Sequence, residues 1–296
     1  SITPPRRGFD TYVGRFLSGN TAQPNMFMTD SCACTDNTAP CRIYSNTQVT
    51  CVDALNVVNA TIDPKTGESV FRVVPPGTFG ADHLDLLLAR QVDLVVTQHV
   101  AAKDPRPLFY YMAWGMPHNP MMSPNRFLNL VMRDSDAKTE PCHRRLRRVH
   151  LAMVAELDEA IGVVQDSLVR NGIWDDTMFV FLTDNGGLQP ISSKPSDWCT
   201  DDWFGFNYPL RGGKYSWWEG GIRTPAFVVM PGVKLGGVYG GIVSLSDWYA
   251  TAVGAGGGGS QLPMTDDDPG GEDSVSHWGV LRQVAAVGAE VTTLEP

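Results

Sequence analysis

The fold is decided by residues 178–187, MFVFLTDNGG, in which a continuous apolar run stops at a polar turn. Such a run is typical of a buried strand. Residues 107–114, PLFYYMAW, form a second run of this kind and end at the loop GMPHNP. Between the two runs, residues 148–170 carry apolar side chains at helical spacing, which predicts an amphipathic helix: Val154, Leu157, Ile161, Val164 and Leu168.

Strand, helix and strand in succession form a βαβ crossover, whose two strands are parallel. Ligands of parallel sheets bind beyond the carboxyl ends of the strands, where this sequence has His118 and Asp184. A further helix is predicted over residues 81–99 and a third strand over residues 225–230. We therefore expect an α/β fold with a mostly parallel central sheet flanked by helices, with His118 and Asp184 on one rim.

Composition restricts the classes of function. The 296 residues are 43% hydrophobic and 19% charged, as in ordinary globular proteins, and the formal net charge is −9. The basic cluster at residues 143–148 leads into the predicted helix, and the acidic balance argues against a nucleic-acid partner. No apolar stretch has the length of a membrane span, so none is expected.

Cysteine usage points to an oxidising compartment. Of the six cysteines, Cys32, Cys34, Cys41 and Cys51 lie close together, whereas Cys142 and Cys199 are isolated. Disulfides in the secretory pathway are favoured over free thiols or a zinc cluster, which stay open as alternatives. Asn59 begins an Asn-Ala-Thr triplet and is a candidate glycosylation site, in weak agreement with that compartment.

Four residues carry the chemistry. Asp184 and Asn185 offer hard oxygen ligands suited to Ca²⁺ or Mg²⁺, although Asn185-Gly186 could instead form a hairpin turn. His118 is flanked by prolines that restrict its backbone, and Lys214 stands among glycines and aromatic residues. Each could equally be an ordinary surface residue. Taken together, metal ligands, an imidazole and an ammonium suit attack on a sulfate or phosphate ester.

The order of several motifs resembles that of the type I sulfatases, in particular the arylsulfatase B-like branch (N-acetylgalactosamine-4-sulfatase and relatives). The resemblance rests on RRGFDTY at 6–12, TDNGG at 183–187, PLRGGK at 209–214 and WEGGIR at 218–223. It is collinear from about Arg6 to Thr251, with a weaker echo at Ser276-His277-Trp278.

The resemblance implies a role for each candidate residue. Asp184 and Asn185 would be ligands of one Ca²⁺ ion, His118 would contact the sulfate or the leaving-group oxygen, and Lys214 would bind the sulfate. His118 and Lys214 are thus the catalytic and substrate-binding candidates. The spacing of Cys41 and Cys51 is similar to a short disulfide loop of arylsulfatase B-like enzymes.

The chain departs from the family pattern at its beginning. The family has its Cys-x-Pro-Ser-Arg nucleophile motif, whose cysteine is oxidised to formylglycine, before the RRGFD stretch, and none of the six cysteines here is followed by the proline and arginine of that motif. We therefore expect no nucleophile in this chain. Residues 1–253 are expected to be a sulfatase catalytic domain without its N-terminal third, residues 254–275 a Gly/Asp-rich linker or insertion, and residues 276–296 the start of the C-terminal part.

The resemblance leads to two functional hypotheses. In the first, the parent protein is a sulfuric ester hydrolase that cleaves sulfate esters of glycans or aryl alcohols, uses Ca²⁺, and requires a formylglycine-generating enzyme as a partner. It would act in the secretory pathway, in the lysosome or outside the cell. In the second, the protein is a catalytically inactive, sulfatase-like secreted binding protein.

Overall fold

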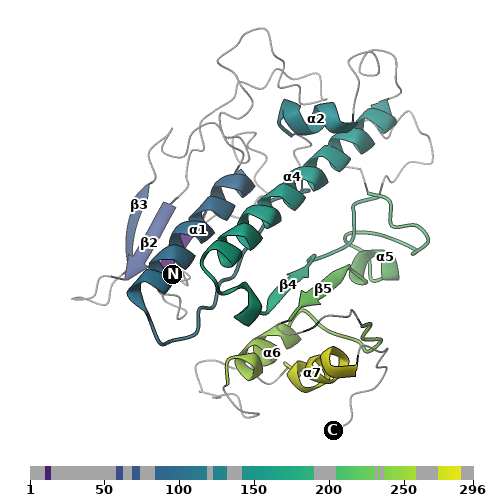
Figure 1. Ribbon diagram of the computed structural model, residues 1–296. Helices are drawn as coiled ribbons and strands as arrows, with labels where there is room; N and C mark the ends of the chain where they lie inside the picture. Colours follow the sequence, from purple (N-terminus) through teal and green to yellow (C-terminus); the bar gives the residue numbers. More distant parts are fainter. Residues whose placement is uncertain are drawn as a thin grey trace, which may run out of the picture. The chain divides into compact units, whose positions relative to one another are not determined.

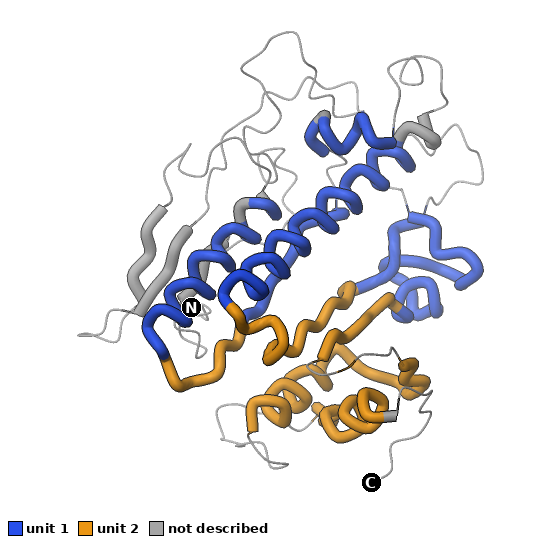
Figure 2. The backbone as a smooth tube through the Cα atoms, viewed as in Figure 1, with its two compact units in different colours: residues 1–103, 110–171, 185–223 blue, residues 104–109, 172–184, 224–296 orange. Residues whose placement is uncertain are grey.

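The computed structural model describes residues 11–14, 58–62, 69–73, 84–118, 123–131, 142–189, 205–230, 233, 237–257 and 273–287. The chain divides into two compact units (Figure 2). Unit 1 comprises residues 1–103, 110–171 and 185–223, and unit 2 comprises residues 104–109, 172–184 and 224–296. Each unit is described by itself.

Unit 1 is built on two long helices that pack against each other (Figure 1). They are α1 (Leu84–Ala102) and α4 (Cys142–Arg170), and the short helix α2 (Asn125–Val131) also packs on α4. Both long helices lie close to the ranges that apolar periodicity predicts. Helix α4 begins before residue 148 because the basic cluster at 143–148 is itself helical, and arginine is a good helix former.

The α1–α4 interface is the main apolar core of unit 1. Helix α1 buries one side chain on each turn, and α4 buries a matching stripe: Leu86, Ala89, Val92 and Val96 on α1, and Leu146, Val149, Met153, Leu157, Ala160, Val164 and Leu168 on α4. The apolar face predicted for α4 is buried at Leu157, Val164 and Leu168, whereas Val154 is exposed. On α1, Leu94 is exposed. Near the end of α4, Ser167 Oγ donates a hydrogen bond of 2.6 Å to Asp93 Oδ1 in the middle of α1.

Unit 1 also holds a small antiparallel sheet. Its strands are β1 (Thr11–Gly14), β2 (Val58–Ile62) and β3 (Ser69–Val73), in the order β1-β2-β3. Asn59, the candidate glycosylation site, lies in the central strand and is paired in register with Val13 and Arg72.

Unit 2 contains a pair of strands that corrects one expectation. Strand β4 (Phe179–Leu182) and strand β5 (Ala226–Val229) occupy the predicted positions, but they pair with each other and run antiparallel. Phe181 stacks on Phe227 across the pair, with ring centroids 5.1 Å apart. The predicted parallel partner of β4 was residues 107–114, and no strand is assigned to that segment.

Residues 107–114 are not the buried strand that the sequence predicts. Phe109 is 61% exposed and Tyr111 is 71% exposed. An apolar strand is buried when other strands and helices cover its faces, and among the described residues no strand pairs with this segment. The prediction of a buried strand at these residues is therefore wrong.

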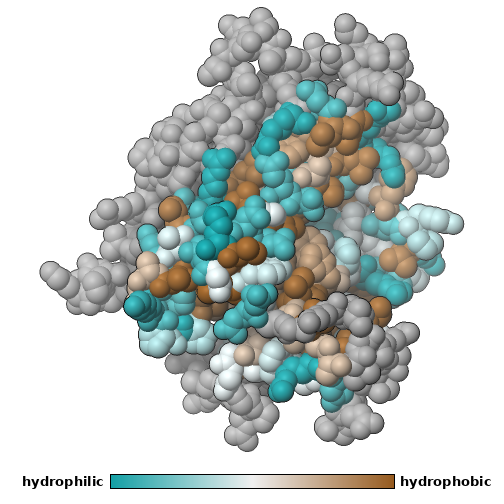
Figure 3. Space-filling model, in the orientation of Figure 1, coloured by the Kyte–Doolittle hydropathy of each residue, from teal (hydrophilic) through white to brown (hydrophobic). Residues whose placement is uncertain are grey.

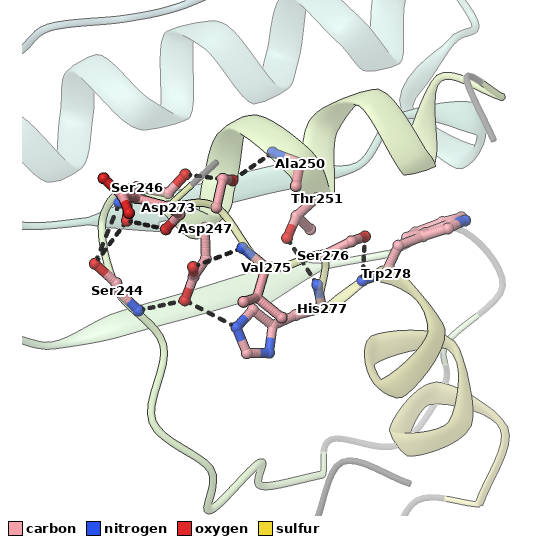
Figure 4. Close-up of polar contacts among 11 residues, drawn as sticks. Ser244, Ser246, Asp247, Ala250, Thr251, Asp273, Val275, Ser276, His277 and Trp278 are labelled. Carbon is pink, nitrogen blue, oxygen red and sulfur yellow. Dashed lines mark hydrogen bonds and ion pairs between the residues drawn. The ribbon is translucent and has the colours of Figure 1, made fainter. Parts of the chain in front are cut away.

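The C-terminal part of unit 2 is held together by a buried carboxylate (Figure 4). Asp247 begins α6 (Asp247–Ala255), and its two oxygens accept hydrogen bonds from the backbone N–H groups of Ser244 and Val275, at 2.7 and 2.9 Å. His277 Nε2 lies 3.0 Å from Asp247 Oδ2 and precedes α7 (Trp278–Val287). One side chain thus joins the start of α6 to the segment that leads into α7.

We predict that this junction weakens in acid. Burial alone would raise the pKa of Asp247, but the hydrogen bonds from Val275, Ser244 and His277 outweigh it, so the pKa lies below its ordinary value. The stabilisation is complete above the pKa of an unfolded aspartate, about 3.9, and is lost as the pH falls through the lower, folded pKa. At pH 7, Asp247→Asn should lower the free energy of unfolding by about 1–3 kcal/mol.

The measurement is amide hydrogen exchange of residues 244–278 as a function of pH. Asp175, exposed in the short 3-10 helix Trp174–Asp176, provides the control variant Asp175→Asn, which should leave the exchange unchanged. Equal protection in Asp247→Asn and the unaltered protein would contradict the prediction.

Some sequence predictions lie outside the described residues. These are the disulfide candidates Cys41 and Cys51, together with Cys32, Cys34 and Cys199. Of the predicted linker at 254–275, the last residues of α6 are helical, and residues 258–272 are not among those described.

Among the described helices, none is long and apolar enough to cross a membrane. The face of the molecule in Figure 3 carries hydrophobic as well as hydrophilic side chains.

Candidate active site

His118 and Lys214 are brought together, although 96 positions separate them in the chain. Lys214 Nζ lies 3.3 Å from His118 Nε2, and both residues belong to unit 1. The ammonium of Lys214 can only donate, whereas the role of the His118 ring nitrogen in this contact depends on its tautomer. The His118 side chain is exposed and Lys214 is half-buried, so the pair can receive a ligand from solvent. An ammonium and an imidazole side by side suit an oxyanion, because each can offer an N–H group to its oxygens.

A buried carboxylate from α1 holds the loop that carries His118. Asp85 is 1% exposed, and its oxygens accept hydrogen bonds from the backbone N–H groups of Gly115 and Met116, at 2.9 and 2.7 Å. It lies in the first turn of α1, where the helix dipole favours a negative charge. The loop then turns tightly, because the His118 N–H donates to the Gly115 carbonyl at 3.0 Å.

The Asp184-Asn185-Gly186-Gly187 segment does not form the hairpin turn that its Asn-Gly pair would also allow. The Gly186 N–H donates to the Gly221 carbonyl, and the Lys214 N–H donates to the Gly187 carbonyl, both at 3.0 Å. The two glycines have ordinary negative φ angles and are needed for close approach instead: a Cβ at Gly186 would overlap the Gly220 carbonyl oxygen. The segment therefore packs, backbone against backbone, on the loop of Lys214 and on α5 (Glu219–Ile222).

Asn207 joins the same two segments through its side chain. Its Oδ1 accepts from the Gly187 N–H at 2.9 Å, and its Nδ2 donates to the carbonyls of Gly187 and Gly212, at 2.8 and 3.1 Å. The carbonyl oxygen of the Asn207 amide thus accepts one hydrogen bond, and its NH₂ group donates two, so the amide bridges the backbones of Gly187 and Gly212. The half-buried Asn207 thus adds to the direct backbone hydrogen bond between the Lys214 N–H and the Gly187 carbonyl, and both hold the Lys214 loop on the TDNGG segment.

We predict that replacing Asn207 separates the two loops. Asn207→Ala removes all three hydrogen bonds and should lower the free energy of unfolding by about 1–3 kcal/mol. Asn207→Asp keeps the acceptor but points a carboxylate at two carbonyl oxygens, which raises its folded pKa, so this variant should be more stable at pH 5 than at pH 7. Thermal melting of both variants at the two pH values is the measurement. Equal melting of Asn207→Asp at both would contradict it.

The fit of these residues to a metal ion is partial. Asp184 is exposed and directly follows β4, and Asn185 is its neighbour in the chain, with Nδ2 donating to the Gly186 carbonyl at 3.0 Å. A carboxylate and an amide oxygen are ligands that Ca²⁺ takes, and a complete shell has about six to eight oxygens. Among the described residues, no group of three or more His, Cys, Asp or Glu side chains is arranged to hold a metal.

Part of this site was predicted from the sequence. The prediction includes His118 and Lys214, which the structure places together, and Asn185, whose segment is hydrogen-bonded to the loop of Lys214. It missed Asp85 and Asn207, which hold the two loops. An acidic residue in a first helical turn and an asparagine before a Tyr-Pro pair both have ordinary local explanations, so neither gave a signal of its own.

Comparison with known proteins identifies the family. The chain matches the Sulfatase family model over residues 4–258. It is therefore a member of the sulfatase family. Among curated proteins, it is 36% identical to Arylsulfatase J of Mus musculus over 160 residues, which is 53% of this chain and 23% of that protein. It is 28% identical to the N-acetylgalactosamine-6-sulfatase of Rattus norvegicus over 174 residues, which is 58% of this chain and 28% of that protein.

Solved structures agree on the fold. Ps i-CgsB in complex with k-i-k-neocarrahexaose matches with a TM-score of 0.59 and 20% identity, over 95% of this chain and 51% of that one. The PsFucS1 sulfatase from Pseudoalteromonas sp. matches with a TM-score of 0.53 and 21% identity, over 76% and 39%. These likenesses confirm the α/β sulfatase-like fold class. The chain spans about a quarter of the length of the two curated relatives.

Proposed function

We propose that the protein containing this chain is a sulfuric ester hydrolase that acts on sulfate esters of glycans or aryl alcohols. The observation that carries the proposal is the 3.3 Å contact between Lys214 Nζ and His118 Nε2. Both residues belong to motifs for which the family resemblance implies sulfate contact, and a long stretch of chain separates them. Two functionally unrelated surface residues would not be expected to lie this close together.

Lys214 and His118 have different roles in the proposed reaction. Lys214 carries a fixed positive charge, which binds the ester sulfate and stabilises the charge that develops on its oxygens as the ester bond breaks. His118 can hydrogen-bond or protonate the departing alcohol oxygen through whichever ring nitrogen carries a proton. The glycines at 186–187 and 212–213 let the segments of the site approach closely, because a Cβ at any of these positions would overlap neighbouring atoms.

Calcium is part of the proposal, with Asp184 and Asn185 as two of its ligands. A bound Ca²⁺ ion would neutralise sulfate oxygens. Further ligands and the formylglycine nucleophile would come from outside the described residues, and the modification would require a formylglycine-generating enzyme. The cysteine-rich segment and the Asn59 triplet support a route through the secretory pathway, to the lysosome or to the cell exterior.

The proposal is tested by turnover of 4-nitrophenyl sulfate by the full-length protein. We expect hydrolysis that is lost in His118→Ala. Hydrolysis that is unchanged in this variant would overturn the assignment of His118. Binding of sulfate esters without any turnover would favour the alternative, a sulfatase-like binding protein.

We predict that Asp184 acts through calcium binding. Calcium that binds only the folded state raises the melting temperature, and Asp184→Ala should reduce this rise because a charged ligand is lost. Calorimetric titration of Ca²⁺ with parallel melting curves is the measurement, and Asp175→Ala, at an exposed aspartate of unit 2, is the control. An unchanged calcium affinity in Asp184→Ala would remove this residue from the metal site.

A further inference from the structure

Tyr215 occupies a backbone position that suits glycine. The Ser216 N–H donates to the Gly213 carbonyl at 3.0 Å, which closes a turn with Lys214 and Tyr215 at its centre. Tyr215 is the third residue of this turn and has a φ of 71°, the value that a type II turn requires there. Glycine or asparagine takes this conformation easily, whereas a bulky side chain is strained by it.

Neither a helix end nor burial of the side chain accounts for this strain. The other non-glycine residue with positive φ among the described residues is Lys103, which ends helix α1, where a left-handed residue commonly terminates a helix. Tyr215 does not end a helix. Its side chain is 82% exposed, so burial of the ring does not offset the strain. Strained residues that persist without a packing benefit concentrate at functional sites.

The ring borders the candidate active site. Lys214 Nζ lies 5.5 Å from the centroid of the Tyr215 ring, within the range of a cation–π contact, and the same Nζ lies 3.3 Å from His118 Nε2. The turn that carries the ring is closed by Ser216 Oγ, which donates to the Gly213 carbonyl at 2.7 Å and accepts from its N–H at 3.1 Å. The exposed ring thus lies on a hydrogen-bonded turn next to the anion-binding pair.

We propose that Tyr215 is a specificity residue that packs against the ring of the leaving alcohol while Lys214 and His118 hold the ester. This inference rests on the proposed function and narrows its substrates to esters with a ring next to the sulfate. Both an aryl ring and the C–H face of a pyranose can pack on a tyrosine, since both are flat and partly apolar. An open-chain alcohol offers no such face.

The test compares three sulfate esters on the full-length protein: 4-nitrophenyl sulfate, a monosaccharide sulfate, and 2,2,2-trifluoroethyl sulfate, which has a good leaving group but no ring. In Tyr215→Gly and Tyr215→Asn, KM for at least one ring ester should rise about 3- to 10-fold, the scale of an aromatic contact. KM for the trifluoroethyl ester should stay the same, and Tyr215→Phe should behave as the unaltered protein. Whichever ring ester is affected identifies the alcohol as aryl or pyranose.

Two further readouts separate specificity from a structural role. The melting temperature of Tyr215→Gly and Tyr215→Asn should hold or rise, because strain is released and no buried contact is lost. Trp217→Ala, which removes another exposed aromatic side chain of the same segment (92% exposed), should leave all three KM values unchanged. A fall in melting temperature, or an equal change for all three esters, would overturn the role of Tyr215 alone. Absence of turnover by the unaltered protein would overturn the proposed function and the inference that rests on it.

Discussion

Lys214→Ala in the full-length protein is expected to lower kcat for an aryl sulfate by about 10²–10³-fold, the usual scale for the loss of one electrostatic donor. The melting temperature should hardly change, because the side chain is half-buried and its described contacts are the exposed His118 imidazole and the exposed Tyr215 ring. Lys214→Arg should restore little activity, since a planar guanidinium does not replace a compact ammonium. Steady-state kinetics and melting curves for the same preparations are the measurement.

Lys103 offers a matched control for this experiment. It is an exposed lysine of unit 1 that follows helix α1, so Lys103→Ala removes the same charge without touching the candidate site. This control should keep full activity. A Lys214→Ala variant that keeps a similar kcat would identify Lys214 as an ordinary turn lysine.

Among glycine-to-alanine substitutions in the described part of unit 1, Gly186→Ala should lower the stability most. The new Cβ would overlap the Gly220 carbonyl oxygen, and backbone atoms of both partners would have to move. We expect the free energy of unfolding to fall by about 3 kcal/mol, the upper range of overpacking. The Gly186 N–H would leave the Gly221 carbonyl, and a displacement of about 1 Å at the neighbouring Lys214 loop would cost about 10²-fold in kcat.

Gly162 provides the opposite case on the same unit. It lies inside helix α4, and no atom lies within 4 Å of the position that a Cβ would take. Gly162→Ala should therefore raise the free energy of unfolding by about 0.5–1 kcal/mol, because alanine favours a helix. Chemical denaturation of the two variants is the measurement. A similar loss of stability in both would show that the contact at Gly220 is not the cause.

Local periodicity predicted the long helices and two of the three strands, but not which strands pair. The spacing of Leu157, Val164 and Leu168 predicts α4, and the apolar runs predict β4 and β5, because these signals are local. The third apolar run, at residues 107–114, is not a strand. Pairing depends on contacts far away in the chain. An apolar run does not specify its neighbour, so periodicity offers no means of choosing β5 over residues 107–114 as the partner of β4.

The same distinction holds for the candidate site. His118 and Lys214 stand in unusual sequence contexts and were predicted. Asp85 and Asn207 act on backbone groups of distant segments, Gly115 and Gly187, and such contacts leave no trace in local composition. Tyr215 was counted among aromatic neighbours of Lys214, but its left-handed conformation follows from a turn that only the three-dimensional structure reveals.

The backbone-to-backbone packing of residues 186–187 on the Lys214 loop and on α5 has a consequence for natural variation. Main-chain N–H and carbonyl groups are the same in every amino acid, so these contacts do not depend on which side chains surround them. Exposed positions of the loop, such as Tyr208, Tyr215 and Trp217, can then change by mutation without moving the lysine. The loop surface can thus vary through drift while the position of Lys214 is kept, provided that the glycines and Asn207 are retained.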